Sequence, residues 1–128
     1  LSLEIKKKKP IFKIYGSNYK TKDGTCIRDY IHVKDIASAH ILAIRGLQKI
    51  KGHEIINLGL GRGISTLDLI KLFEKINNIK LNYKFSNRRK GDVPESYADN
   101  RKAKRILGWK AQYNYSDMVR DSWMSQMN

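Results

Sequence analysis

The apolar residues of this chain switch repeatedly between two spacings along the sequence. Over residues 27–33 they alternate, so that Ile27 and Val33 fall on the same face of an expected strand. From Asp35, a residue type that caps helices, the apolar residues of 36–47 recur at helical spacing. Short strands that alternate with helices predict a mixed α/β fold, and 128 residues allow one domain at most.

Turn and capping residues divide the rest of the chain into further elements. Asp23-Gly24 predicts a turn, which could close a hairpin. Ser65–Asp68 resembles a helix-capping box, while Asp99 and Ser116 are candidate helix caps and Gly108 a candidate helix end. We therefore expect further strands at 11–15, 54–58 and 81–85, and further helices after Ser65 (with an apolar stripe of Leu69, Leu72, Phe73 and Ile76), from Asp99 to Gly108 and from Ser116.

The chain is strongly basic, and this charge bears on its partners. It has 26 Lys and Arg residues against 12 Asp and Glu residues, which gives a formal net charge of +14. Such a charge favours anionic partners, and a basic nucleic-acid-binding module is one alternative function. The lysines are scattered, however, and runs occur only at 6–9 and 88–90. We therefore interpret most of them as solvated surface, and expect segment 1–10 to be basic and exposed.

Several other site types are not supported by the sequence. Cys26 is the only cysteine, which excludes an internal disulfide and a cysteine-based zinc site. No apolar run approaches the roughly 18 residues of a membrane span, and the order of residues in 1–9 does not match a signal peptide. Metal ligands are not expected either, because the spacing of the histidines does not fit; these are His32, His40 and His53.

Two motifs invite a nucleotide-cofactor interpretation that their details do not support. The glycines of 59–63 are spaced Gly-x-Gly-x-Gly, so the third glycine is one position early for the dinucleotide-binding fingerprint. Tyr30 and Lys34 have the spacing of a dehydrogenase Tyr/Lys pair, but they fall in an expected strand and the turn beyond it. We interpret the glycines as a strand-to-helix turn and the pair as accidental.

A third group of residues suggests an anion site. Arg28 and Tyr30 lie on one face of the expected strand, and Arg88–Asp92 forms a second cationic loop that contains a carboxylate. Guanidinium groups bind phosphate oxygens bidentately, a carboxylate can accept from ribose hydroxyls, and Tyr15 could stack on a base. The alternative is that these are ordinary surface arginines, paired with Asp29 or Asp92.

Longer strings of residues resemble a known family. Residues 23–35, DGTCIRDYIHVKD, resemble the DGTxxRDYIHVxD segment of UDP-glucose 4-epimerases, which belong to the extended short-chain dehydrogenases. Residues 14–19 resemble the block before it, with Asn18 in place of an Asp. Residues 57–61, 88–92 and 103–109 follow in the order and spacing of the family, and the resemblance extends from about residue 11 to 123.

The resemblance implies that the chain is the C-terminal, UDP-sugar-binding portion of a mixed α+β enzyme, without the Rossmann half. In the family, that N-terminal half holds NAD and the catalytic Tyr/Lys pair, so we expect no catalytic residue, cofactor or metal in this chain. The complete enzyme would be an isomerase of galactose metabolism that acts on UDP-glucose and UDP-galactose, is cytoplasmic and can form homodimers. By itself the chain is expected to be inactive, and no membrane or specific nucleic acid is an expected partner.

The resemblance also implies roles for individual residues. Arg28 and Arg89 correspond to residues that grip the UDP diphosphate, and Asp92 to a carboxylate near the ribose. The remaining site residues are Tyr15 beside the uracil, Tyr30 near the nucleotide, and Ser96, whose small side chain would leave room for UDP-N-acetylhexosamines. Another nucleotide-sugar epimerase, dehydratase or decarboxylase is the alternative within this superfamily.

Overall fold

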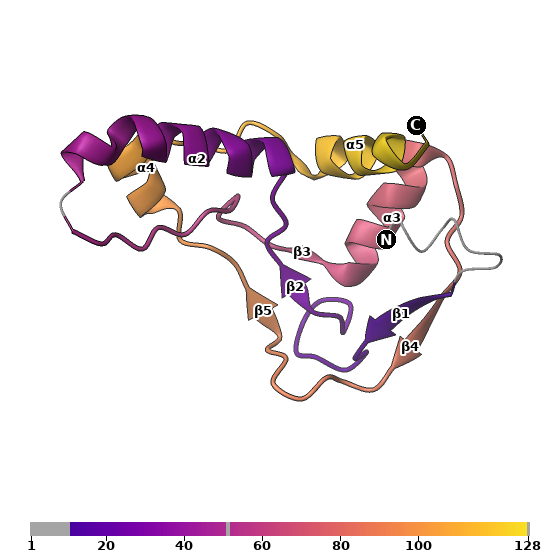
Figure 1. Ribbon diagram of the computed structural model, residues 1–128. Helices are drawn as coiled ribbons and strands as arrows, with labels where there is room; N and C mark the ends of the chain where they lie inside the picture. Colours follow the sequence, from indigo (N-terminus) through magenta and orange to yellow (C-terminus); the bar gives the residue numbers. More distant parts are fainter. Residues whose placement is uncertain (1–10, 51, 128) are drawn as a thin grey trace.

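The chain folds into helices gathered along one side and short strands on the other (Figure 1). A computed structural model describes residues 11–50 and 52–127, so the basic segment 1–10 lies outside the described residues. The mixed α/β fold is confirmed. The elements in chain order are β1 (Phe12–Tyr15), β2 (Ile27–Arg28), α2 (Val33–Gly46), the 3-10 helix η1 (Leu47–Lys49), β3 (Ile64–Ser65), α3 (Thr66–Asn77), β4 (Tyr83–Ser86), β5 (Glu95–Ser96), α4 (Arg101–Leu107) and α5 (Tyr115–Met127).

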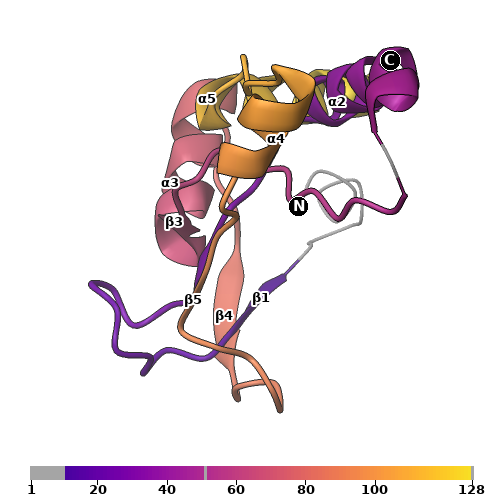
Figure 2. The same ribbon diagram turned by 90° about the vertical axis from the view of Figure 1, so that its left-hand side faces the viewer.

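Two small sheets carry the strands. β1 pairs with β4 in parallel, and β2 pairs with β3 in antiparallel and with β5 in parallel, so the second sheet has the order β3-β2-β5. Figure 2 shows the same molecule turned by 90°, with α3 running from beside α5 down toward the strands. Because β4 belongs to one sheet and β5 to the other, the loop between them connects the two sheets.

The packed interior lies mainly under the helices. Ala39 of α2, Ala103 of α4 and Trp109 are at most 2% exposed and form one buried cluster. The indole Nε1 of Trp109 donates to the backbone oxygen of Asp35 and to the hydroxyl of Ser38, both at 3.0 Å. The cluster is extended by half-buried apolar side chains, among them Ile31, Leu42, Ile56, Leu58, Leu107 and Ala111.

A second packing contact joins α3 to α5. Phe73 of α3 and Val119 of α5 are buried, and the ring of Phe73 meets that of Trp123 edge to face, with their centroids 6.0 Å apart. Ile70 is buried beside Phe73, whereas Ile76, which we placed in the apolar stripe, is 37% exposed. The prediction that Ile76 belongs to the packed apolar stripe was therefore wrong. Among the described residues, no helix has the length and apolar content needed to cross a membrane.

The start of α2 differs from the sequence-based prediction. The helix begins at Val33, and the Nδ1 atom of His32, not the side chain of Asp35, caps it by accepting the Lys34 amide at 3.1 Å. The carboxylate of Asp35 is 1% exposed and accepts the backbone amides of Gln112 and Tyr113 at 2.9 and 3.1 Å. The Asp35 carboxylate therefore binds a segment that is distant in the sequence and does not cap its own helix. The strand expected over 27–33 is also shorter than predicted, because β2 contains only two residues.

Helix caps that depend on neighbouring residues are predicted with mixed success. Ser65 caps α3 by accepting the Asp68 amide at 3.1 Å, as predicted. The prediction of Ser116 was wrong, because Asn114 accepts the amides at the start of α5. α4 begins at Arg101, so the cap position is Asn100, one residue after the predicted Asp99. The carboxylate of Asp99 nevertheless accepts the Arg101 amide at 3.0 Å, whereas the side chain of Asn100 makes no cap bond. Gly108 ends α4 with a φ of +65°, as predicted.

Two strand predictions were wrong. The turn at Gly24 forms, with a φ of +76°, but β1 and β2 pair with other strands, so it closes no hairpin. Residues 54–58 belong to no strand ladder of the described residues. Ile56 and Leu58 pack against the Trp109 cluster, while Ile55 is 84% exposed. The alternation therefore reflects a surface segment with one packed face.

We predict that replacing Asp35 by Ala lowers the free energy of unfolding by about 2–4 kcal/mol, because two inward-facing amides lose their acceptor. Urea unfolding followed by tryptophan fluorescence measures this loss. Asp68→Ala is the matched control: its carboxylate is 55% exposed and lies 3.9 Å from Lys71, so the expected change is within about 0.5 kcal/mol. Equal losses in the two variants would contradict the role assigned to Asp35.

Candidate functional site

The two parallel strand pairings set where the predicted site residues lie. Arg28 of β2 stands opposite Ser96 of β5 in the register of the sheet. Tyr15 ends β1 opposite Ser86, the last residue of β4. The loop over 87–94 runs from the end of β4 to the start of β5. Its arginines and carboxylate therefore lie on the connection between the strand that pairs with Tyr15 and the strand that pairs with Arg28.

Arg28 and Asp92 meet in this region. A terminal nitrogen of the Arg28 guanidinium lies 3.5 Å from an oxygen of Asp92, and the two side chains are 26% and 30% exposed. The other terminal nitrogen donates to the backbone oxygens of Ile27 at 2.8 Å and Pro94 at 3.4 Å. Arg28 is therefore oriented by its own strand and by the end of the loop, and its ion pair with Asp92 is loose and reachable by water.

Arg89 lies on the ring of Tyr15. The central guanidinium carbon is 3.8 Å from the ring centroid, which is a close cation–π contact. We had expected Tyr15 to offer its ring to a base; in this structure one face of that ring is covered by Arg89. The contact places the exposed Arg89 guanidinium at a fixed point beside the end of β1.

Tyr30 and Ser96 complete the predicted set. Burial raises the pKa of the Tyr30 hydroxyl, although the charge of Arg28 and a hydrogen bond with Thr66 act in the opposite direction. Tyr30 lies before the first residue of α2, so it does not share a helix face with Lys34. Ser96 is exposed and, with Arg28, lines a cavity of about 350 Å³.

The sequence analysis missed the role of Asp29. One oxygen of its carboxylate accepts the amide of Leu60 at 3.0 Å, and the other accepts the amides of Gly61 at 3.0 Å and Ala98 at 3.3 Å. Two donors of the glycine turn are thus bound to a carboxylate of the chain itself, which agrees with its interpretation as a structural turn. No local signal pointed to this role, because Asp29 lies within the strand expected over residues 27–33 and its partners are 31 to 69 residues away.

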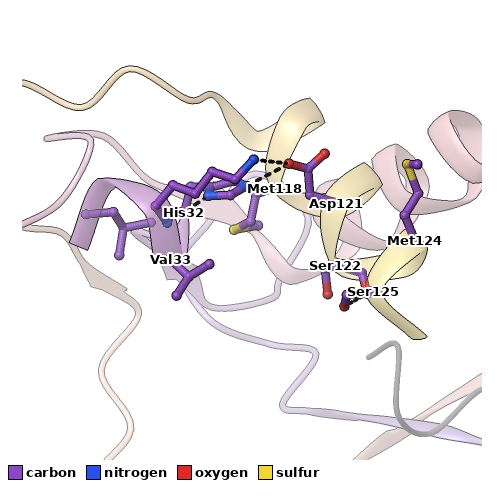
Figure 3. A pocket seen from close by; sticks show the side chains of 9 residues that line it. His32, Val33, Met118, Asp121, Ser122, Met124 and Ser125 are labelled. Atoms are coloured by element: carbon purple, nitrogen blue, oxygen red, sulfur yellow. Dashed lines mark hydrogen bonds and ion pairs between the residues drawn. The ribbon is translucent and has the colours of Figure 1, made fainter. Parts of the chain in front are cut away.

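A second cavity, of about 640 Å³, lies between the start of α2 and α5. Figure 3 shows His32 and Asp121 pointing toward one another there, with Nε2 of His32 3.3 Å from the carboxylate. Lys34 lies 3.5 Å from the same oxygen. Because Nδ1 of His32 already accepts the Lys34 amide, both ring nitrogens are engaged, and His32 is not free to accept a proton from a substrate.

Within residues 11–50 and 52–127, no three His, Cys, Asp or Glu side chains come close enough together to hold a metal ion. Of the cavities described, the one beside β2 combines guanidinium, carboxylate and small polar side chains, which suits a phosphorylated, hydroxylated ligand.

We predict that Gly59→Ala destabilises the chain by about 1–3 kcal/mol, because an added methyl group overpacks the site. A Cβ at position 59 would lie 2.4 Å from an oxygen of Asp29 and 2.7 Å from the Cβ of Ala98. Gly46→Ala, at the end of α2, meets nothing within 4 Å and should instead raise stability by about 0.5–1 kcal/mol. Urea unfolding of both variants checks this, and an unaffected Gly59→Ala protein would count against the packing of Asp29 on the turn.

Comparison with known proteins places this geometry in a family. The family model described as GDP-mannose 4,6 dehydratase matches residues 2–122. The UDP-glucose 4-epimerase of Bacillus subtilis is 44% identical over 113 residues, which are 88% of this chain and 33% of that protein. That of Dictyostelium discoideum is 46% identical over 120 residues, or 93% of this chain and 35% of the relative. The chain thus spans about a third of the length of the curated relatives it matches.

Solved structures of UDP-glucose 4-epimerases also match this chain. The UDP-glucose-4-epimerase of Stenotrophomonas maltophila, with bound NAD and formylated UDP-arabinopyranose, matches with a TM-score of 0.87 and 44% identity, covering 92% of this chain and 35% of that one. The enzyme of Bifidobacterium longum, in complex with NAD+ and UDP, matches with a TM-score of 0.88 and 39% identity, covering 98% and 37%. The chain belongs to the family described as GDP-mannose 4,6 dehydratase, and within it resembles the C-terminal part of the UDP-glucose 4-epimerases.

Proposed function

We propose that this chain is the nucleotide-binding part of a UDP-glucose 4-epimerase, which as a complete protein interconverts UDP-glucose and UDP-galactose. The observation that carries the proposal is the convergence of Arg28, Asp92 and Ser96 beside β2, with Arg89 in the same loop as Asp92. The similarity to epimerases that hold UDP or a UDP-sugar supports the choice of ligand.

The energies of the competing ion pairs favour an incoming diphosphate. A partly exposed pair such as Arg28–Asp92 contributes about 0–1 kcal/mol. A charge-assisted bond between a guanidinium and phosphate contributes about 1.5–3 kcal/mol. A diphosphate would therefore displace Asp92 from Arg28, and the released carboxylate could accept from ribose hydroxyls. Tyr15 would meet the uracil, and Tyr30 would lie near the nucleotide.

This arrangement suits a reaction in which the sugar must turn while the nucleotide stays bound. Interactions with the diphosphate leave the sugar free to present either face to the reacting groups. Binding energy is thus placed on the part of the substrate that does not react. In this proposal Arg28 and Arg89 hold the substrate and take no part in proton transfer.

The described residues do not fit NAD, which the related structures contain. The amides of the glycine turn are bound by Asp29, and Tyr30 and Lys34 do not share a helix face. We propose that NAD and the catalytic groups belong to the rest of the complete protein, and that this chain alone is inactive.

An exposed apolar surface supports the proposal that further polypeptide packs here. α2 and η1 present a row of apolar side chains that are 51–72% exposed, on the side away from Ala39; these are Val33, Ile41, Ile44 and Leu47. Ile55, in the segment 54–58, is exposed as well. A helix with apolar residues on both faces is typical of a buried helix. In the complete protein we propose that the N-terminal half covers this surface, and that a homodimer would form through other residues.

We predict that the chain binds one UDP saturably and that Arg28→Ala or Arg89→Ala weakens binding about 10- to 100-fold, the loss of one charge-assisted phosphate bond. Amide NMR titration with UDP measures the affinity and shows whether each variant is folded.

Arg105→Ala is the matched control for this titration, because Arg105 is an exposed arginine of α4, away from the loop over 87–94. It should bind UDP like the parent chain. Tighter binding of GDP than UDP would instead assign the site to another nucleotide sugar, and equal loss in all three variants would indicate general charge attraction.

We further predict that Ser96→Tyr weakens binding of UDP-N-acetylglucosamine more than that of UDP-glucose, about 10-fold more, as expected for a steric clash with the N-acetyl group. Ser96 is exposed beside the cavity next to Arg28, so the larger ring should not disturb the fold. Competition titrations with both nucleotide sugars on the parent and the variant give the ratio. An unchanged ratio would show that Ser96 does not select the sugar.

A further inference from the structure

The two neighbouring arginines of the loop over 87–94 have different surroundings. Arg89 lies on Tyr15, as described above. Arg88 lies on Tyr19, with its central guanidinium carbon 4.0 Å from the ring centroid. Its Nε also donates to the side-chain oxygen of Asn18 at 2.7 Å, and a terminal nitrogen donates to the backbone oxygen of Asn18. The guanidinium of Arg88 therefore binds the segment after β1 in two ways: its face lies on the Tyr19 ring and its edge donates to Asn18.

The segment that receives Arg88 is itself firmly placed. Tyr19 is 5% exposed, and its amide donates to the backbone oxygen of Gly24 at 3.0 Å. The amide of Gly16 donates to Ser86 at 2.8 Å and extends the pairing of β1 with β4. Gly16 has a φ of +85°, and a Cβ there would lie 2.2 Å from the Tyr19 ring and 3.0 Å from Cγ of Arg88. The glycine allows the close approach of ring and arginine.

The far end of the loop is held in a different way. The amide of Asp92 donates to the backbone oxygen of Arg89 at 3.2 Å, which closes a turn between them. Asp92 then reaches Arg28. The start of the loop lies on Tyr19 through Arg88, so Arg89 lies between two anchors.

We propose that Arg88 is a positioning residue: by clasping Asn18 and Tyr19 it fixes the start of the loop, and so places Arg89 and Asp92 for a nucleoside diphosphate. This inference rests on the proposed function. Arg88 uses its Nε edge and one face of its plane on the protein. The phosphate ligands are Arg28 and Arg89.

Two substitutions separate positioning from simple attraction of charge. Arg88→Lys keeps the positive charge but lacks the planar fork that binds Asn18 and covers Tyr19. Asn18→Asp keeps the acceptor and turns its bond to Arg88 into an ion pair, while it adds one negative charge to the site. If Arg88 positions the loop, Arg88→Lys should weaken UDP binding and Asn18→Asp should not. If Arg88 only attracts the ligand by its charge, Asn18→Asp should weaken UDP binding and Arg88→Lys should not.

The test uses two measurements on the 128-residue chain. The first, without ligand, is the NMR signal of the Arg89 side-chain Nε–H, which the Tyr15 ring displaces upfield. The second is the affinity for UDP. Arg88→Lys should lose the displacement and weaken UDP binding about 10-fold, similar to the loss of one phosphate bond. Asn18→Asp should keep the displacement and change the affinity less than about 3-fold.

Arg62→Lys is the control, because Arg62 lies 5.6 Å over Tyr115, outside the loop, and should leave both readings unchanged. An Arg88→Lys chain that keeps the Arg89 signal and the UDP affinity overturns the inference, as does one that loses amide dispersion throughout and so unfolds. If the parent chain binds no UDP, the proposed function fails, and the ligand-free Arg89 signal still decides whether Arg88 positions the loop.

Discussion

The carboxylate of Asp29 is the interaction on which the arrangement beside β2 depends. It follows Arg28 directly and accepts backbone amides from the glycine turn and from Ala98 after β5. By accepting three amides, this carboxylate holds two segments, the glycine turn and residue 98, at hydrogen-bond distance from the end of β2. β2 and β5 therefore keep their register, and Arg28 stays opposite Ser96. Gly59 is required because no Cβ fits against this carboxylate.

In the proposed function, the loop over 87–94 completes a UDP-binding site on this scaffold. Each of its ends is set by a different parallel pairing, β1 with β4 and β2 with β5. Along its length, Arg88 lies on the ring of Tyr19 and Arg89 on that of Tyr15, while Asp92 reaches back to Arg28. The proposed site depends on the joining of the two small sheets, because Arg28 belongs to β2 of one sheet and Arg89 to the loop that continues from β4 of the other.

Local chemistry explains which predictions succeeded. Ser65 and Gly108 were identified because a cap and a helix end depend on groups within a few residues of each other. Asp35 was wrongly predicted as a helix cap, because its carboxylate accepts backbone amides that are 77 and 78 residues away in the sequence. Residues 54–58 alternate like a strand, yet they pack one face on the Trp109 cluster without a ladder partner among the described residues.

The sequence by itself determined the mixed fold, the family and the residue types of the candidate site, because periodicity and motif strings are local properties of the chain. The tertiary structure alone decided that Asp29 binds the glycine turn, that Arg89 covers Tyr15 and that Arg88 clasps Asn18 and Tyr19. These contacts join residues that are 31 to 74 positions apart. Such partners are selected by burial and by competition for hydrogen bonds, which the spacing of residues along a chain does not specify.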